Sequence, residues 1–290
     1  MNIVENNYIT TVGSGEKFSV NIEPLPQGLT YFKESLIAAE KIESCKVGKL
    51  YVMYSGGVDS EYTVSVFKES RIDFTPVIIK FKNDYNLHDL EYAFKFCQHK
   101  NLKPLVIDID FDQFVTSGEF LKISKEMQSA VYHRAATAYA IGKLDGSVIC
   151  GEGEPYIRKN EKTNSWNVTI YQHDYAIANY YKKHNICGTP HFNRYTPEMM
   201  RTFMEDPRLK ELALNQVPGK LGSDSSKYII YNRDSDFDLE ERPKYHGYEK
   251  IEKSSIFDHE SFQELEIIGK EWDGSWSLDY HKFLETLCIQ

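Results

Sequence analysis

The residues most able to do chemistry stand in one short run after an apolar segment. The run is Ser55-Gly56-Gly57-Val58-Asp59-Ser60, with the strand-like segment Leu50 to Tyr54 before it and the helix-compatible segment Glu61 to Ser70 after it. Two adjacent glycines can adopt backbone conformations closed to other residues, so several N–H groups can point at one anion near the positive end of the helix. Ser55 and Ser60 add hydroxyl donors, and Asp59 can orient a backbone amide or hold a magnesium ion on phosphates. The run therefore predicts a phosphate-binding loop.

The composition of this loop indicates which phosphate it holds. The common nucleotide loop has a lysine after its second glycine that reaches the terminal phosphates, and residues 55–60 contain no lysine. Such a loop is better suited to holding a departing pyrophosphate than a transferred terminal phosphoryl group. The alternative is a tight turn that binds no ligand.

The loop lies in a stretch with the pattern of a parallel sheet. Short β-branched runs alternate with longer helix-like stretches, which predicts an α/β Rossmann-like fold with helices on both faces of the sheet. The predicted strands are Leu50 to Tyr54, Thr75 to Phe81, Pro104 to Ile109 and Ser147 to Cys150. The predicted helices include a crossover helix over residues 87–97 and an alanine-rich helix from Met127 to Leu144.

The rest of the chain divides into two further regions. Residues 1–47 form an N-terminal extension in which Tyr8 to Val12 and Phe18 to Ile22 can pair as a hairpin. Residues 48–155 form the nucleotide domain, and residues 156–290 form a mainly helical, loop-rich substrate or lid region packed on it. Within that last region, Val217 to Lys253 is dense in Gly, Pro, Ser and charges, which is typical of a functional loop.

A second glycine motif follows the fourth predicted strand. Gly151-Glu152-Gly153-Glu154 comes directly after Cys150, at the carboxyl end of a strand, where sheets of this kind bind ligands. Alone, the pattern Gly-x-Gly after a strand can simply turn the chain. Because this second motif follows another strand of the same predicted sheet, we expect it to line the same site as the first motif.

Together these motifs resemble the N-type PP-loop ATP pyrophosphatases, of the adenine nucleotide α-hydrolase-like superfamily with its HUP-type sheet. That superfamily includes asparagine synthetase, argininosuccinate synthetase, GMP and NAD synthetases, the queuosine-pathway synthase, lysidine synthetase and tRNA thiolases. Ser55 to Ser60 is similar to its signature, and Gly151-Glu152-Gly153 to a stretch of the asparagine synthetase branch that helps to form the ATP and pyrophosphate site. The resemblance implies ATP over the strand ends, Mg²⁺ on its phosphates and an adenylated intermediate.

The resemblance also suggests roles for single residues. The superfamily commonly holds adenine at the end of the second strand, which makes Phe81 the expected neighbour of the base, although a packed core residue is as reasonable. Synthetases of this type often bring a late lysine to the α-phosphate, and Lys227 and Lys244 are the candidates here. Arg134, beside His133 on the alanine-rich helix, can bind phosphate in a bidentate manner. For each of these cations a solvated charge is the alternative.

The chain departs from the family in two respects. Position 2 is Asn rather than the cysteine nucleophile of a glutaminase, and only 54 residues precede the loop, so we expect no intrinsic glutaminase. Nitrogen would then come from ammonia, a separate chain or an amine of the substrate. The thiolases commonly use paired Cys-x-x-Cys motifs or a persulfide cysteine; no such pair occurs here, and Cys150 and Cys187 are the remaining candidates.

A metal site independent of ATP is a further alternative. His184, Cys187 and His191 lie at three- and four-residue intervals, which imitates the spacing of zinc ligands, with His173 as a conceivable fourth. A polar loop with ordinary histidines explains the same spacing.

Composition restricts the partners. The net charge of −9 disfavours a protein that holds nucleic acid by neutralising phosphates. Five scattered cysteines, the absence of a secretory pattern and the lack of a long apolar run predict a cytoplasmic protein with free thiols and no membrane segment. The oligomeric state is left open.

The sequence thus predicts an ATP-dependent synthetase that adenylates a carboxylate or carbonyl oxygen, releases pyrophosphate and then transfers an amine or ammonia with release of AMP. The acceptor is a small molecule or a nucleobase that no residue pattern identifies. One alternative is a sulfurtransferase that uses the same adenylation step with a sulfur donor. The other is a module that binds adenine nucleotides without turnover.

Overall fold

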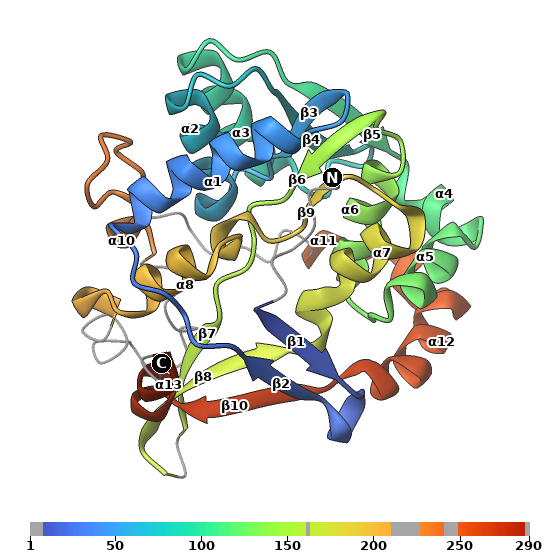
Figure 1. Cartoon of the computed structure of the whole chain (residues 1–290). Helices are drawn as coiled ribbons and strands as arrows, with labels where there is room; N and C mark the ends of the chain where they lie inside the picture. The colour runs from blue at the N-terminus through green and yellow to red at the C-terminus, as the bar shows by residue number, and fades with distance from the viewer. Residues whose placement is uncertain (1–7, 161–162, 210–226, 241–248, 288–290) are drawn as a thin grey trace.

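A five-stranded parallel sheet lies in the upper part of the view in Figure 1, between two groups of helices. The computed structural model describes residues 8–160, 163–209, 227–240 and 249–287. The strands of this sheet are β3 (Lys49–Met53), β4 (Thr75–Phe81), β5 (Leu105–Ile109), β6 (Gly146–Ile149) and β9 (Gly188–Thr189). All four predicted strands are confirmed, with ends within one residue of those expected from the pattern. The short strand β9 was not expected.

The strand order places the two glycine motifs side by side. The order is β5-β4-β3-β6-β9, so the chain runs outward from β3 to β5 and then returns to start again at β6. Sheets with this order bind ligands outside the carboxyl ends of the strands, at the point where the order reverses. That point lies between β3 and β6, the strands that deliver the chain to Ser55 and Gly151.

Helices cover both faces of the sheet, as predicted. Strand residues alternate between the faces because successive side chains of a strand point in opposite directions: Leu50 and Val52 lie in one apolar cluster, Tyr51 and Met53 in another. The helices on the first face are α1 (Tyr31–Cys45), α2 (Val58–Glu69) and α3 (Leu87–His99). Those on the second face are α4 (Phe111–Thr116), α5 (Glu119–Met127), α6 (Tyr132–Ile141), α7 (Ala176–His184) and α12 (Glu260–Gly269).

An antiparallel sheet and an N-terminal hairpin lie below the parallel sheet in the view of Figure 1. The antiparallel sheet, of order β10-β8-β7, is built from β7 (Tyr156–Asn160), β8 (Ser165–Tyr171) and β10 (Ser275–Asp279). The N-terminal hairpin pairs β1 (Ile9–Val12) with β2 (Ser19–Ile22). The other helices are α8 (Pro197–Met204), α10 (Tyr228–Tyr231), α11 (Glu249–Glu252) and α13 (Tyr280–Leu287). In the described ranges, no helix is both long and apolar enough to cross a bilayer.

One expectation about local structure was wrong. The predicted helix from Met127 to Leu144 is only the helix α6, because α5 ends at Met127 and Gln128 takes a left-handed conformation (φ +55°) that a helix cannot continue. The described part of the predicted functional loop, Val217 to Lys253, contains the short helices α10 and α11, and Ile230 and Tyr231 of α10 are buried. The domain boundaries at residues 47 and 155 stay a proposal.

Candidate active site

The loop after β3 turns the chain into the N-terminus of α2. Gly56 has φ +89°, a conformation that favours glycine, and Gly57 is the N-cap of α2 without any side-chain cap. The Ser55 hydroxyl accepts a hydrogen bond from the Gly57 N–H (3.3 Å) and lies 3.1 Å from the Ser60 hydroxyl, which donates to the Gly57 carbonyl (2.9 Å). The first N–H groups of a helix have no acceptor within the helix, so this uncapped end can bind an anion.

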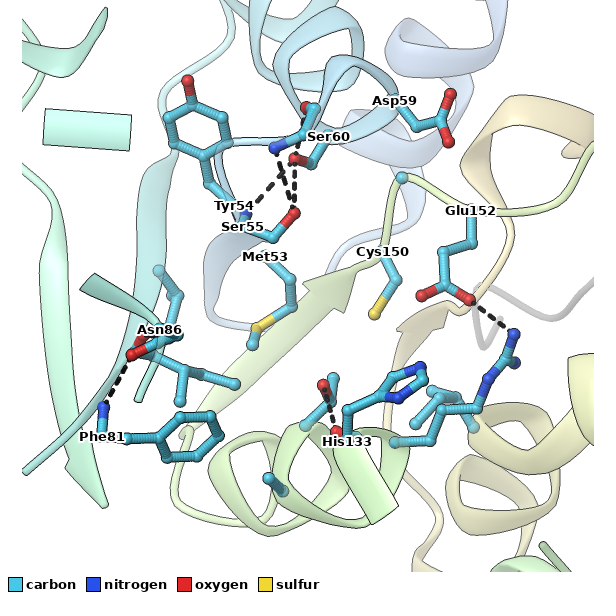
Figure 2. Close-up of a pocket in the computed structure, with 18 residues that line it drawn as sticks. Met53, Tyr54, Ser55, Asp59, Ser60, Phe81, Asn86, His133, Cys150 and Glu152 are labelled. Atoms are coloured by element: carbon cyan, nitrogen blue, oxygen red, sulfur yellow. Dashed lines mark hydrogen bonds and ion pairs between the residues drawn. The ribbon is translucent and has the colours of Figure 1, made fainter. Parts of the chain in front are cut away.

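This helix end faces a cavity at the carboxyl ends of β3, β4 and β6. The cavity has a volume of about 220 Å³ and opens to solvent. Figure 2 shows the loop residues Ser55 and Ser60 on one side, Phe81 and Asn86 on a second, and His133, Cys150 and Glu152 on a third.

Most of the predicted site residues line this cavity. Those that do are Ser55, Gly57, Asp59, Ser60, Phe81, Arg134, Gly151 and Glu152. Gly153 and Lys227 line an adjoining chamber that shares Asp59, His133, Arg134 and Glu152 with the cavity. Gly56 and Val58 are absent from both walls: Gly56 is buried within the turn and Val58 packs on the apolar core.

Phe81 and Asn86 form the side of the cavity on β4. Phe81 is 1% exposed and packs edge-on against Phe111, with ring centroids 5.3 Å apart. The Phe81 backbone N–H donates to Oδ1 of Asn86 (3.1 Å), and Nδ2 of Asn86 donates to the carbonyl of Ile79 (2.9 Å). The backbone at the end of β4, the strand end where the resemblance implies adenine, is therefore hydrogen-bonded to a side chain of the protein itself.

Arg134 lines the cavity, but acidic partners hold its guanidinium. It donates to the carbonyl of His173 (2.8 Å) and forms ion pairs with Asp174 (3.2 Å) and Glu152 (3.4 Å). Burial by itself would lower the pKa of Arg134, but Glu152 and Asp174 raise it above its ordinary value. Arg134 is thus a permanently charged wall residue, and its contact with phosphate stays a proposal.

A buried polar cluster lies next to the loop, between the cavity and α10. Nζ of Lys227 lies 3.2 Å from Asp59 and 3.3 Å from Glu154, and the side chains of Lys227 and Glu154 are 7% and 1% exposed. The Tyr231 hydroxyl contacts both carboxylates, at 2.7 Å from Asp59. Burial raises the pKa of Glu154 to about 7, with the attraction of Lys227 opposing this rise. The structure therefore brings Lys227 to the loop, although 168 residues separate Lys227 from Asp59.

The other predicted cation and the zinc ligands are not in the site. Lys244 lies outside the described residues. His184 pairs with Glu126 (2.8 Å), Cys187 accepts from Ser147 (3.2 Å), and Nε2 of His191 lies 2.6 Å from the carbonyl of Asp174. Across the residues that the structure describes, no three His, Cys, Asp or Glu side chains are arranged to hold a metal ion. The zinc alternative is therefore not supported.

Of the two cysteines considered for sulfur transfer, only Cys150 reaches the cavity. It is buried, lies 3.7 Å from the Tyr181 hydroxyl, and its burial raises the pKa of the thiol to about 12. A thiol of this kind stays protonated near neutral pH, which disfavours attack by sulfur.

Sequence reasoning missed several residues of the site. Glu154 is the last residue of the second motif, and the available signal for its role is that a carboxylate directly after Gly-Glu-Gly can pair with a cation. Tyr231 lies four residues after Lys227, on the same side of a helix, which is the available signal for their joint contact with Asp59. His133 lines both the cavity and the adjoining chamber, and nothing in the spacing of Asn86 predicted its bonds to β4.

Comparisons with known proteins found no family model and no curated protein that matches the chain. Among solved structures, a predicted subunit of a tRNA methyltransferase from Methanocaldococcus jannaschii is similar at 14% identity, over 69% of this chain and 95% of the other, with a TM-score of 0.33. An NMN synthetase from Francisella tularensis is similar at 15% identity, over 80% of this chain and 94% of the other, with a TM-score of 0.34. Similarity this distant carries no argument about the reaction.

Proposed function

We propose that this protein is an ATP pyrophosphatase that adenylates a carboxylate or carbonyl oxygen of an acceptor and then transfers an amine or ammonia to it. The observation that carries the proposal is the loop from Ser55 to Ser60. It opens a helix N-terminus onto a cavity at the switch point of the sheet, and a buried lysine, Lys227, lies next to its aspartate.

In the first step the acceptor oxygen attacks the α-phosphorus of ATP. A bond forms between this oxygen and phosphorus, and the bond from the α-phosphorus to the oxygen bridging to the β-phosphorus breaks with its electron pair. Pyrophosphate leaves at the N-terminus of α2, where backbone N–H groups and the Ser55 and Ser60 hydroxyls offer donors. In the second step the nitrogen attacks the activated carbon, the carbon–oxygen bond to AMP breaks, and the nitrogen loses a proton to solvent.

Lys227 is the proposed source of positive charge for the first step. Its ammonium is held at Asp59, and Asp59 lines the cavity beside the loop. Charge builds up on the α-phosphate oxygens as pyrophosphate departs, and a preorganised cation in a site shielded from water stabilises this charge. A lysine has a long flexible side chain, so a rotation of Lys227 away from Glu154 would direct its ammonium into the cavity.

The protein offers few ligands for magnesium, which suits an ion carried by the nucleotide. Mg²⁺ in nucleotide sites is commonly held by one or two carboxylates, with phosphates and waters completing its shell. Asp59 is the proposed carboxylate: its side chain is 34% exposed and lies at the cavity wall. When bound, the ion would neutralise charge on the leaving pyrophosphate.

Nitrogen is favoured over sulfur as the group transferred. The one described cysteine at the cavity, Cys150, is a buried protonated thiol, and the chain has no Cys-x-x-Cys pair. Replacing Cys150 with Ser should leave turnover within about threefold of wild type, whereas a persulfide carrier would lose turnover entirely.

The test is to identify the products of ATP. Purified protein is incubated with ATP, MgCl₂, ammonium chloride and panels of small carboxylates, ureido compounds and nucleobase lactams, and the phosphorus-containing products are identified by ³¹P NMR. We expect AMP and pyrophosphate in equal amounts with the cognate acceptor. Asp59→Asn, which removes the charge but keeps the shape, should lower the rate by about a hundredfold or more.

Three outcomes would contradict the proposal. ADP with orthophosphate would show cleavage at the wrong phosphorus. ATP binding that never leads to turnover across the panels would favour the non-catalytic module. A normal rate in Asp59→Asn with unchanged thermal stability would remove the loop from the reaction.

A further inference from the structure

The strand β4 extends beyond its neighbour β3 and leaves part of its edge without a strand partner. Pairing of β3 with β4 ends at Met53 and Val77, and the N–H of Tyr54 donates to the Val77 carbonyl (2.8 Å) as the last contact on this side. The N–H of Lys82 donates to Ile109 of β5, so alternate residues of β4 face opposite neighbours. Ile79 and Phe81 therefore direct their backbone groups to the same side as Val77, past the end of β3.

The side chain of Asn86 occupies this open edge. Its Nδ2 donates to the Ile79 carbonyl (2.9 Å), and its Oδ1 accepts from the Phe81 N–H (3.1 Å), the bond drawn in Figure 2. One carboxamide thus satisfies an acceptor and a donor of β4 at once, as a neighbouring strand would. Asn86 also lines the large cavity, so the same contact is accessible to a ligand in it.

The Asn86 side chain bonds to β4 instead of capping the helix α3. It is the N-cap residue of α3, and Asn at this position normally accepts a hydrogen bond from the first turn of the helix, but its side chain makes no cap here. When the carboxamide leaves β4, the N–H groups of the first turn of α3 are the partners that an N-cap asparagine accepts from. The cost of leaving β4 is partly offset by the cap that it gains.

The pattern on β4 matches one chemical group of a nucleotide. A carboxamide places an N–H donor beside an acceptor, and adenine does the same with its amino group and the adjacent ring nitrogen. A purine that lacks the 6-amino group keeps the ring nitrogen but offers no donor to the Ile79 carbonyl. The apolar side chains of Val77, Ile79 and Phe81 line the cavity beside this edge, as a flat ring requires.

We propose that the Asn86 side chain is an internal substitute for adenine, which ATP displaces from β4 and which then caps α3. This inference rests on the proposed nucleotide site and adds a specificity-determining residue to it. Asn86 competes with the base in the free protein, and its two bonds set the donor and acceptor order that an incoming base must reproduce.

Calorimetric titration with ATP and with purine riboside triphosphate, which lacks the 6-amino group, each with MgCl₂ and without acceptor, tests this role. Asn86→Ala removes the competitor and should tighten ATP binding by about three- to tenfold, with less than a twofold change for purine riboside triphosphate. Asn86→Ser is too short to span Ile79 and Phe81 but is a good N-cap, so it should tighten ATP binding similarly while keeping α3 stable. Asn83→Ala is the matched control, because Asn83 lies in the same connection and bonds to Asp112.

The outcomes separate this inference from the proposed function. Weaker or unchanged ATP binding in Asn86→Ala and Asn86→Ser, or an equal change for ATP and purine riboside triphosphate, overturns the role of Asn86. If ATP still yields AMP and pyrophosphate, the proposed function stands. If neither nucleotide binds any variant, both proposals fail. In ¹⁵N NMR spectra, the side-chain amide signals of Asn86 should shift on addition of ATP, and signals that stay in place also contradict displacement.

Discussion

Glu154 offers a direct test of the buried cluster through the pH dependence of stability. Its carboxylate is 1% exposed and shares the Tyr231 hydroxyl with Asp59. A phenol has one proton and can donate it to only one of two carboxylates. The second contact is satisfied when Glu154 is itself protonated and donates to the phenol oxygen, which agrees with a pKa raised to about 7 by burial.

The size and sign of the effect follow from this pKa. Between the ordinary value of 4.5 and about 7, the folded protein binds a proton at Glu154 that the unfolded chain has released. The contribution to stability is therefore fully present below about pH 4.5 and is lost as the pH rises to about 7. A tenfold change in ionisation corresponds to about 1.4 kcal/mol, so the loss across this window is on the order of 3 kcal/mol.

The assay is urea unfolding of wild type and Glu154→Gln at several values of about pH 4.5 to 8, without magnesium or nucleotide. Because other groups titrate in both proteins, the quantity of interest is the difference between their free energies of unfolding. Wild type should lose about 3 kcal/mol relative to Glu154→Gln over the window. Glu152→Gln is the control: burial opposes it, but the attraction of Arg134 holds the pKa of Glu152 below its ordinary value of 4.5, so its contribution is lost only below about pH 4.5 and the difference between wild type and this variant should stay constant over the window. A difference for Glu154→Gln that does not vary with pH would refute the reasoning.

Two further predictions concern the loop and the lysine. Gly56→Ala and the control Gly118→Ala force alanine into similar left-handed conformations (φ +89° and +82°), and each should lower the free energy of thermal unfolding by about 1–2 kcal/mol. Only Gly56→Ala should weaken ATP binding. Equal effects of the two variants on ATP binding would show that the loop is only a turn. Lys227→Gln leaves buried carboxylates without their cation and should lower the free energy of unfolding in denaturant by about 3–5 kcal/mol. The double variant Lys227→Gln/Glu154→Gln should regain part of this lost free energy. Strictly additive losses in the double variant would contradict the buried ion pair.

The parallel sheet and the phosphate loop could be predicted because their determinants are local. Short β-branched runs between helical patterns fixed the four strands to within one residue, and the double glycine after β3 required a turn that few other residues permit. The helix boundary at Gln128 could not be predicted, since its alanine-rich surroundings favour a helix and only the packed structure shows the left-handed turn.

The buried cluster and the pairing of Asn86 with β4 depend on contacts that sequence spacing does not encode. Lys227 was one of several cations in a polar segment, and only the packing of α10 on α1 and α2 selects it from the others. Asn86 at the start of a helix predicts a cap, and its real partners are exposed only because β3 ends four residues before β4 does, in the register of the sheet. Both features are set by tertiary structure, which overrides the local preference.

The two glycine motifs, predicted separately, form one packing unit, and this unit determines where Asp59 lies. A Cβ at Gly151 would collide with the Thr63 hydroxyl and would lie 3.0 Å from both the Asp59 carbonyl and Cα of Ser60, so only glycine lets the end of β6 touch the first turn of α2. The side chain of Asn193 then bridges the two, accepting from the Thr63 hydroxyl (3.2 Å) and donating to the Gly151 carbonyl (3.0 Å). Because the backbone of Asp59 is fixed by this contact, its carboxylate can meet Lys227 without further adjustment. The second motif therefore holds the first one in position as well as lining the cavity.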